Sequence, residues 1–199
     1  MANQALIIML KNPIPGTVKT RLAKDIGDAA TLKVYEKLLQ RVLEVTTNLE
    51  TDVFLFYSDT INRADIFPNA RYKKYTQCSG DLGIRMDYAF SIPFKNEYKQ
   101  VVMMGADCYE LTQNHIESAF SALAQHDFVI GPAMDGGYYL IGMKKWHRWV
   151  LQDKSWSTSE LLSETIKDIT VHQQSYVLLE QLSDIDVLED AQKHPELLQ

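Results

Sequence analysis

Residues 5–10 read Ala-Leu-Ile-Ile-Met-Leu, and residues 11–16, which read Lys-Asn-Pro-Ile-Pro-Gly, follow them directly. An unbroken apolar run of this length is typical of a strand buried on both faces, as in a parallel sheet. The two prolines and the glycine end that strand in a loop. This pair of segments therefore predicts an α/β fold that opens with a strand buried on both faces.

Similar apolar runs recur along the chain and alternate with stretches of helical spacing. The predicted strands are 53–57, 71–77, 101–105, 128–132, 138–143 and 176–179, and the predicted helices are 29–48, 80–90, 114–125, 160–169 and a last one from 187. The run 138–143 is expected to be antiparallel or at a sheet edge. Alternating strands and helices predict three layers, with helices on both faces of a mostly parallel sheet. In such sheets ligands bind beyond the carboxyl ends of the strands.

The composition predicts one globular domain spanning residues 1–199. The chain is 46% hydrophobic and 23% charged, with a formal net charge of −6. This charge argues against broad nucleic-acid binding, which needs a basic face. No secretory signal and no apolar stretch long enough to span a bilayer are recognised, so we expect a cytoplasmic protein. Cys78 and Cys108 form no CxxC pair, which leaves zinc and redox motifs unsupported.

The loop after the first strand carries Pro15, Gly16, Lys19 and Arg21. Glycine lets a backbone approach a ligand closely, and Lys and Arg supply a point charge and a planar fork for phosphate oxygens. The loop matches neither GxxxxGK[ST] nor GxGxxG. A helix starting near residues 17–21 would aim its free N–H groups and its dipole at an anion. We interpret the loop as a nucleotide-phosphate site, with two solvated surface cations as the alternative.

Two acidic residues follow strands in the same way. Asp107 ends the run 101–105, where a carboxylate could hold Mg²⁺ together with phosphate oxygens. Asp135 precedes Gly136, Gly137 and Tyr138, a segment that could leave room for an acceptor. The alternatives are a capping or turn role for Asp107 and a hairpin turn around Asp135.

Other motifs are less specific. Asp81 and Arg85 flank a glycine-containing helix start that could contact a nucleotide, or could be a plain turn. Asp184 and Asp186 would project to one side of an extended segment, where they could face a metal or cap the last helix. Within 156–158, which reads Trp-Ser-Thr, a hydroxyl could cap the helix from 160.

The order of these motifs resembles one family across nearly the whole chain. The motifs are PIPGTVKTRL (13–22), GDLGIRM (80–86), GADC (105–108), GPAMDGGYYLIG (131–142), WST (156–158) and DID (184–186). They are similar to those of the bacterial glycosyltransferase-like proteins of GT-A type known as radical-SAM/selenodomain-associated transferases. This resemblance implies the nucleotide-diphospho-sugar transferase fold, which also serves enzymes that transfer nucleotidyl groups.

The resemblance also implies roles for single residues. Lys19 and Arg21 would contact the nucleotide phosphates, Asp107 would bind the metal, and Asp135 would complete the metal site on the acceptor side. Tyr109 departs from the pattern, since proline usually follows the cysteine, and it stands where an Asp-x-Asp motif would have its second acid.

Together these observations predict a Mg²⁺- or Mn²⁺-dependent transferase that uses a nucleotide-activated donor and an acceptor that the sequence does not identify. A glycosyltransferase releasing nucleoside diphosphate is the first version, and a nucleotidyltransferase releasing pyrophosphate is the second. Two other classes stay open: a non-catalytic nucleotide or sugar-phosphate binder, and a fold that has lost its site. The pair Trp146 and Trp149 fits either a core or the interface of a homodimer.

Overall fold

The computed structural model describes residues 3–199 and builds them around a seven-stranded sheet of order β3-β2-β1-β4-β6-β5-β7. Neighbouring strands are parallel except for β4–β6 and β5–β6, so β6 alone among the described strands is reversed. In chain order the elements are β1 (Gln4–Leu10), α1 (Thr20–Ile26), α2 (Asp28–Thr47), β2 (Asp52–Tyr57), β3 (Tyr72–Thr76), α3 (Leu82–Lys95), β4 (Gln100–Met104), α4 (Gln113–Gln125), β5 (Phe128–Pro132), β6 (Tyr138–Met143), η1 (Arg148–Leu151), α5 (Leu161–Val171), β7 (Tyr176–Leu178), α6 (Leu188–Gln192) and η2 (Pro195–Leu198).

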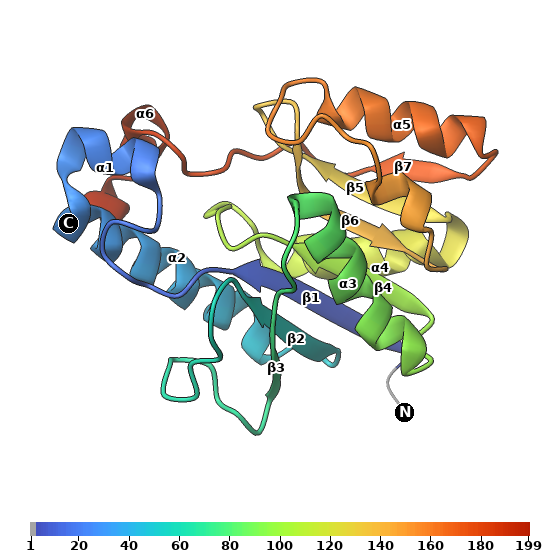
Figure 1. Ribbon diagram of the computed structural model, residues 1–199, viewed down its shortest axis with the longest axis horizontal. Coiled ribbons are helices and arrows are strands. Elements are labelled where there is room, and N and C mark those ends of the chain that lie inside the picture. The colour runs from blue at the N-terminus through green and yellow to red at the C-terminus, as the bar shows by residue number, and fades with distance from the viewer. Residues whose placement is uncertain (1–2) are drawn as a thin grey trace.

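Helices cover both faces of this sheet, as predicted, and β1 lies inside it between β2 and β4 (Figure 1). Successive strand side chains point to opposite faces. Leu6 and Ile8 of β1 therefore enter the core shared with α2 and α4, whereas Ala5 and Ile7 enter the core shared with α3 and α5. All four side chains are fully buried, which explains why the sequence of β1 is apolar without alternation.

The predicted strands are present within one or two residues of their expected bounds. The prediction for 138–143 is confirmed in its direction, since β6 is antiparallel to both neighbours. It is wrong in its alternative of an edge position, because β6 lies between β4 and β5. A helix start near residues 17–21 was expected, and α1 begins there at Thr20. Its end was not predicted, because only Leu22 of its seven residues is buried, too few to show an apolar period.

The start of α5 also differs from expectation. Neither Ser157 nor Thr158 caps this helix with its side chain, because the Thr158 hydroxyl donates to the carbonyl of Ser155, 2.8 Å away. The loop is fastened by Glu164 instead, which accepts hydrogen bonds from the amide and hydroxyl of Ser155.

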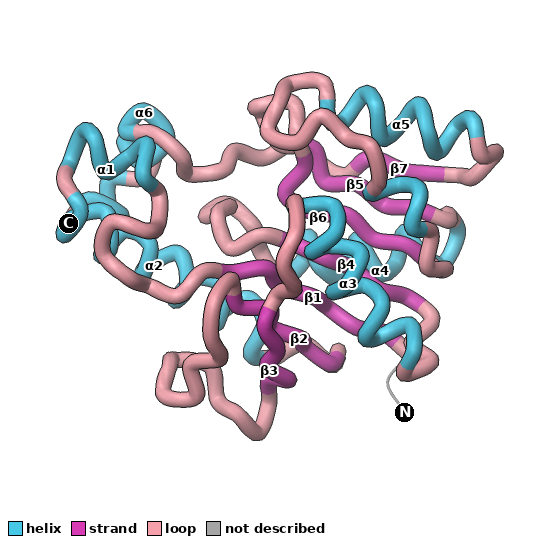
Figure 2. The backbone as a smooth tube through the Cα atoms, viewed as in Figure 1, coloured by secondary structure: helices cyan, strands magenta, loops and turns pink. Residues whose placement is uncertain are grey.

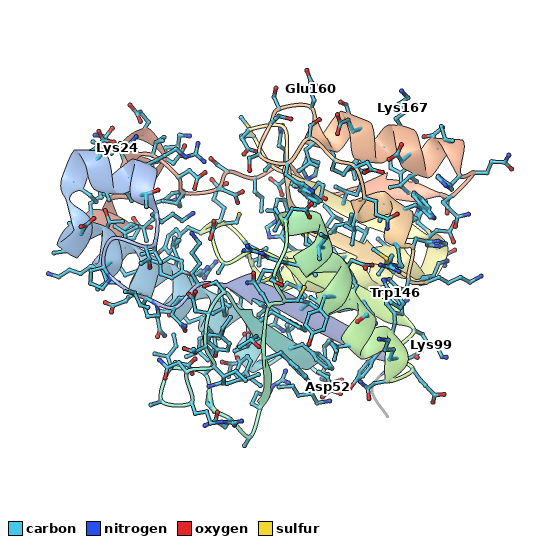
Figure 3. All side chains as sticks on the ribbon, viewed as in Figure 1. Lys24, Asp52, Lys99, Trp146, Glu160 and Lys167 are labelled. Atoms are coloured by element: carbon cyan, nitrogen blue, oxygen red, sulfur yellow. The ribbon has the colours of Figure 1, made fainter. Side chains whose placement is uncertain are left out.

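Long loops gather at the carboxyl ends of the parallel strands (Figure 2). Asp52, Lys99 and Trp146, labelled in Figure 3, mark the opposite, amino-terminal ends of the strands, and Lys24 lies on the loop side. No helix within residues 3–199 is both long and apolar enough to cross a membrane.

An extended segment near the C-terminus crosses this loop region between β7 and α6 (Figure 1). It is fastened to the turn after β5 by Met134 N donating to Leu182 O at 3.0 Å, and to the loop after β4 by Ile185 N donating to Asp107 O at 3.0 Å. Ile185 is fully buried between two acidic neighbours. The segment is therefore held in place by both its backbone and a core side chain.

We expect Ile185→Ala to lower the free energy of unfolding by about 2–5 kcal/mol, because it removes a fully buried branched side chain and leaves a cavity. Urea denaturation followed by circular dichroism measures this. Ile66→Ala, at a side chain that is 44% exposed, is the matched control and should change stability by no more than about 0.5 kcal/mol. Equal losses in the two variants would show that the segment is not anchored through Ile185.

Candidate functional site

A cavity of about 540 Å³ opens at the carboxyl ends of β1 to β4. Among the residues that line it, the charged ones are Lys11, Lys19, Arg21, Arg85, Asp107, Asp184 and Asp186. Four basic side chains thus share the cavity with three acidic ones, and the acidic ones come from the loop after β4 and from the C-terminal segment.

We call the charged side chains that line the cavity the charged wall, and Lys19 is at its centre. Its side chain is only 5% exposed, and its Nζ lies 2.6 Å from Asp107 Oδ2 and 3.0 Å from Asp186 Oδ1. Burial by itself would lower the pKa of Lys19, but the two carboxylates outweigh it and raise the pKa. Lys19 is thus a fixed positive charge that joins three segments far apart in the sequence.

The backbone of Lys19 has φ 46° in the left-handed region, which is uncommon for a residue with a side chain. This conformation stands directly before α1. Such strain persists only where surrounding contacts determine it. The two ion pairs of the Lys19 ammonium are contacts of that kind.

Arg21 and Asp186 extend the network toward solvent. The Arg21 guanidinium donates to Asp186 Oδ2, and its side chain is 67% exposed. Burial alone would raise the pKa of Asp186, but Lys19 and then Arg21 hold it below its usual value. Asp186 therefore stays ionised, and Arg21 has donors left over for a ligand.

Asp184 behaves in the opposite way. Burial, and then the negative charge of Asp107, raises the pKa of Asp184 from 3.8 to about 7, although Lys19 opposes this. No hydrogen bond is made to its carboxyl group by residues 3–199. Near neutral pH this side chain is close to the point where it loses its proton.

From the sequence, Asp135 on the loop after β5 was expected to bind the metal together with Asp107. Asp135 does not line the cavity, and its Oδ1 accepts a hydrogen bond from Gly137 N at 2.9 Å within a tight turn. Asp184 and Asp186 line the cavity instead. Asp107 thus shares the cavity lining with Asp184 and Asp186, while Asp135 lies close enough for its charge to help raise the pKa of Asp184.

Gly136 and Gly137 do not line the cavity either, whereas Tyr138 does. A Cβ on Gly136, where φ is +89°, would lie 2.3 Å from the carbonyl oxygen of Ser159. Close backbone packing explains this glycine better than contact with an acceptor. The Tyr138 hydroxyl is buried without a hydrogen-bond partner among the described residues, and burial raises its pKa.

Pro15 and Gly16 shape the first loop without lining the cavity. Gly16 has φ +76° and is the third residue of a turn closed by Thr17 N donating to Ile14 O at 3.2 Å. Their contribution is to turn the chain so that Lys19 and Arg21 face the cavity.

Asp81 and Arg85 also differ in whether they line the cavity. Asp81 is the N-cap of α3, since its Oδ1 accepts from Ile84 N at 2.8 Å, and it does not line the cavity. Arg85 does line it, held by its Nε donating to Gly80 O at 2.8 Å. Only Arg85 of this predicted pair can reach a ligand there.

For Asp184 and Asp186 the sequence left two roles open, which were to face a metal or to cap the last helix. They do not cap α6, because Asp190 Oδ2 accepts from the backbone N–H groups of Asp186 and Val187 at 3.1 and 3.2 Å. The Asp-x-Asp spacing could have identified these two residues as a pair in one site, since an extended backbone sends both side chains to one side.

The donor set of the wall suits a divalent cation with hard-oxygen preference. Within residues 3–199 no three His, Cys, Asp or Glu side chains are already grouped as a metal centre. Asp107 is 43% exposed and Asp184 makes no hydrogen bond, so carboxylate oxygens of both are free to bind. Mg²⁺ is commonly held by one or two carboxylates together with phosphate oxygens and water, and these residues fit that arrangement.

The pKa of Asp184 leads to a pH-dependent stability. Between pH 3.8 and about 7 the unfolded chain loses a proton that the folded protein keeps, so stability falls across this window and then levels off. Asp184→Asn removes the penalty. Without metal, we expect the variant to exceed the wild type by up to about 4 kcal/mol at pH 8, and by far less at pH 4.

Urea denaturation in EDTA at the two pH values measures this difference. Asp25→Asn, an exposed position on α1, is the control. A gain for Asp184→Asn that is the same at pH 4 and pH 8 would contradict a raised pKa.

Solved structures with this fold include nucleotide-using enzymes. A protein from Desulfovibrio desulfuricans, provisionally assigned as a nucleotide-diphospho-sugar transferase, is 28% identical with a TM-score of 0.90, over 96% of this chain and 85% of that one. The inositol-1-phosphate CTP transferase from T. maritima is 14% identical with a TM-score of 0.59, over 99% and 95%. A Mycobacterium tuberculosis protein in complex with manganese is 11% identical with a TM-score of 0.55, over 97% of each chain.

The α/β fold inferred from the sequence is thus that of the nucleotide-diphospho-sugar transferases. No curated protein matches the sequence significantly. The model of a family described as an uncharacterized protein conserved in bacteria (DUF2064) matches residues 39–158, which is more than half of the chain, and the chain belongs to that family.

Proposed function

We propose that this protein is a metal-dependent transferase that takes a group from a nucleotide-activated donor. One observation carries the proposal: the buried ammonium of Lys19 is shared by Asp107 and Asp186 on the wall of a cavity beyond the strand ends. Burying charged groups is costly unless they are paired. A wall with this many charged groups is better explained by an anionic ligand than by stability.

The charge balance of the wall supports a metal. The carboxylates of Asp107, Asp184 and Asp186 line the cavity beside Lys19 and Arg21, and carboxylate charge that no cation offsets would repel phosphate oxygens. We propose that Asp107 and Asp184 hold Mg²⁺ or Mn²⁺, in place of the pairing of Asp107 with Asp135. When bound, the ion would bridge carboxylate and phosphate oxygens and neutralise charge that develops during transfer.

The protein's own residues then position the donor. Arg21, which is mostly exposed, can turn its free N–H groups to the phosphates while its contact with Asp186 fixes the loop. Lys19 supplies a positive charge that is already in place, so little reorganisation is needed when charge builds on the leaving phosphate. Transfers of this kind depend on positioning and on charge stabilisation.

Two reactions fit this site. In glycosyl transfer the sugar–oxygen bond to the phosphate breaks and nucleoside diphosphate leaves, which the assignment of the D. desulfuricans protein supports. In nucleotidyl transfer the bond between the α- and β-phosphates breaks and pyrophosphate leaves.

The absence of an acid at Tyr109 supports nucleotidyl transfer. This residue stands where a second acid of Asp-x-Asp would be, but it lies outside the cavity lining and packs against His194, with ring centroids 5.2 Å apart. The acid partner of Asp107 comes from the C-terminal segment instead. We retain glycosyl transfer as the first candidate and nucleotidyl transfer as the second.

We expect nucleotides to stabilise the protein only with a divalent cation. At 100 times the Kd, a bound nucleotide adds about 2.7 kcal/mol, which a thermal-shift screen of nucleoside triphosphates and nucleotide sugars with Mg²⁺, Mn²⁺ or EDTA resolves. Asp107→Asn should lose the metal-dependent part of the shift. Asp25→Asn, exposed on α1, should keep it. Binding that is indifferent to metal and to Asp107 would indicate a different site.

The nucleotides found by that screen then serve as donors in a turnover assay. Lys19→Met keeps the length of the side chain and removes its charge, so we expect kcat/KM to fall by about 10²–10³. Free nucleoside diphosphate would identify glycosyl transfer, and pyrophosphate would identify nucleotidyl transfer. Tight binding with neither product would leave a non-catalytic binder as the better description.

A further inference from the structure

The two edges of the sheet differ in how they are protected from pairing with another chain. β3, at one edge, carries the consecutive lysines Lys73 and Lys74, and Lys73 is exposed. Lysine on an edge strand opposes further pairing, because its charge would have to be buried. β7, at the other edge, has no charged residue and lies at the rim of the molecule away from α1 and α6 (Figure 1).

The segment around β7 is uncharged. Residues 169–179 are the longest stretch of the chain without Asp, Glu, Lys or Arg, although most of them are exposed. Val171, Tyr176 and Leu178 within it are large apolar side chains that are 67%, 36% and 43% exposed. A group of exposed apolar side chains on one segment is typical of an interaction surface. We call residues 169–179 the uncharged edge.

The backbone of β7 bonds to β5 through every second residue. Ser175 O accepts from the β5 backbone at 3.0 Å, and Leu179 N donates to the β5 backbone at 2.8 Å. In a parallel pair the residues between these bonding positions turn their N–H and C=O groups to the other side. Tyr176 and Leu178 therefore direct both backbone groups away from the sheet, where β7 has no partner strand within residues 3–199.

The side chains of β7 alternate between the two faces of the sheet. Val177 packs against the core shared with α2 and α4, so Tyr176 and Leu178 lie on the opposite face, which carries α5. The unpaired backbone groups and the exposed apolar side chains thus belong to the same two residues.

We propose that two copies of this chain pair antiparallel through β7, about a two-fold axis at Val177, so that Tyr176 stands opposite Leu178 of the second copy. These two residues would exchange both N–H···O bonds, and the symmetry-related pair would do the same. On the α5 face their side chains would form an aromatic–aliphatic cross-strand pair twice. Two-fold contacts of this kind are the commonest in homo-oligomers.

A second copy matches the charge of this surface. The chain has a formal net charge of −6, so copies that met through their charged surfaces would repel each other. At the uncharged edge both copies contribute neutral groups, whereas a strongly charged partner would find no opposite charge there. No residue of the uncharged edge lines the cavity, so pairing leaves both sites open and does not depend on the transferase proposal.

Sedimentation equilibrium over a range of protein concentrations measures the dimerisation constant. We expect the wild type to be a dimer at micromolar concentration. Leu178→Lys removes the cross-strand contact at both symmetric positions and puts a charge on the edge, so we expect dimerisation to weaken by roughly 30-fold or more. Ile66→Lys, at a side chain that is 44% exposed between β2 and β3, is the matched control and should leave the constant unchanged.

Val177→Cys tests the register of the pairing. Across the two-fold axis the two copies of residue 177 form a non-hydrogen-bonded pair, with Cα atoms about 4.5 Å apart, which a disulfide can bridge. Mild oxidation should link two copies of this variant, whereas the wild type, with only Cys78 and Cys108, should stay unlinked. Leu178→Cys, whose thiol would face Tyr176 of the second copy, is the control and should link poorly.

A wild type that stays monomeric at every concentration would overturn the proposal, and so would a dimer that a folded Leu178→Lys leaves intact. Cross-linking of Leu178→Cys as readily as of Val177→Cys would overturn it as well. The melting temperature of Leu178→Lys shows whether the fold is kept. Should the fold be lost, the cross-linking of Val177→Cys decides, and its absence overturns the proposal.

Discussion

The shared ion pair of Lys19 with Asp107 and Asp186 is the interaction on which the candidate site depends. It joins the loop after β1, the loop after β4 and the C-terminal segment at one point. Because the Lys19 side chain is almost fully buried, none of the three segments can move away without leaving a charge unpaired in a poorly solvated place. The same contact keeps Asp186 ionised and leaves Asp107 partly open to the cavity.

The sheet explains why these segments meet. β1 is parallel to its neighbour β4 and its carboxyl end lies beside that of β4, so loops that are remote in sequence emerge next to each other. The reversed strand β6 carries the chain back, which lets β7 and the segment after it approach the same end of the sheet. The cavity at this end of the sheet is therefore lined by residues from both halves of the chain.

Much of the fold could be predicted because its signals are local. The strands β1, β2 and β4 are buried on both faces, and their unbroken apolar runs predict this burial without knowledge of the elements that pack on them. The helices α2 and α4 show apolar spacing for the same reason. The extent of α1 and the interior place of β6 could not be predicted. The helix has a single buried residue, and β6 takes its position from its pairings with β4 and β5.

The sequence by itself determined which residue types stand after each strand: Lys19 and Arg21 after β1, Asp107 after β4, and an Asp-x-Asp spacing near the C-terminus. Only the tertiary structure decided which of them share a cavity. It turned Asp135 into a turn residue and Asp81 into a helix cap, and it brought Asp184 and Asp186 to Lys19. The physical reason is that a carboxylate satisfies a nearby backbone N–H as readily as it binds a cation, and the choice depends on contacts between segments far apart in the chain.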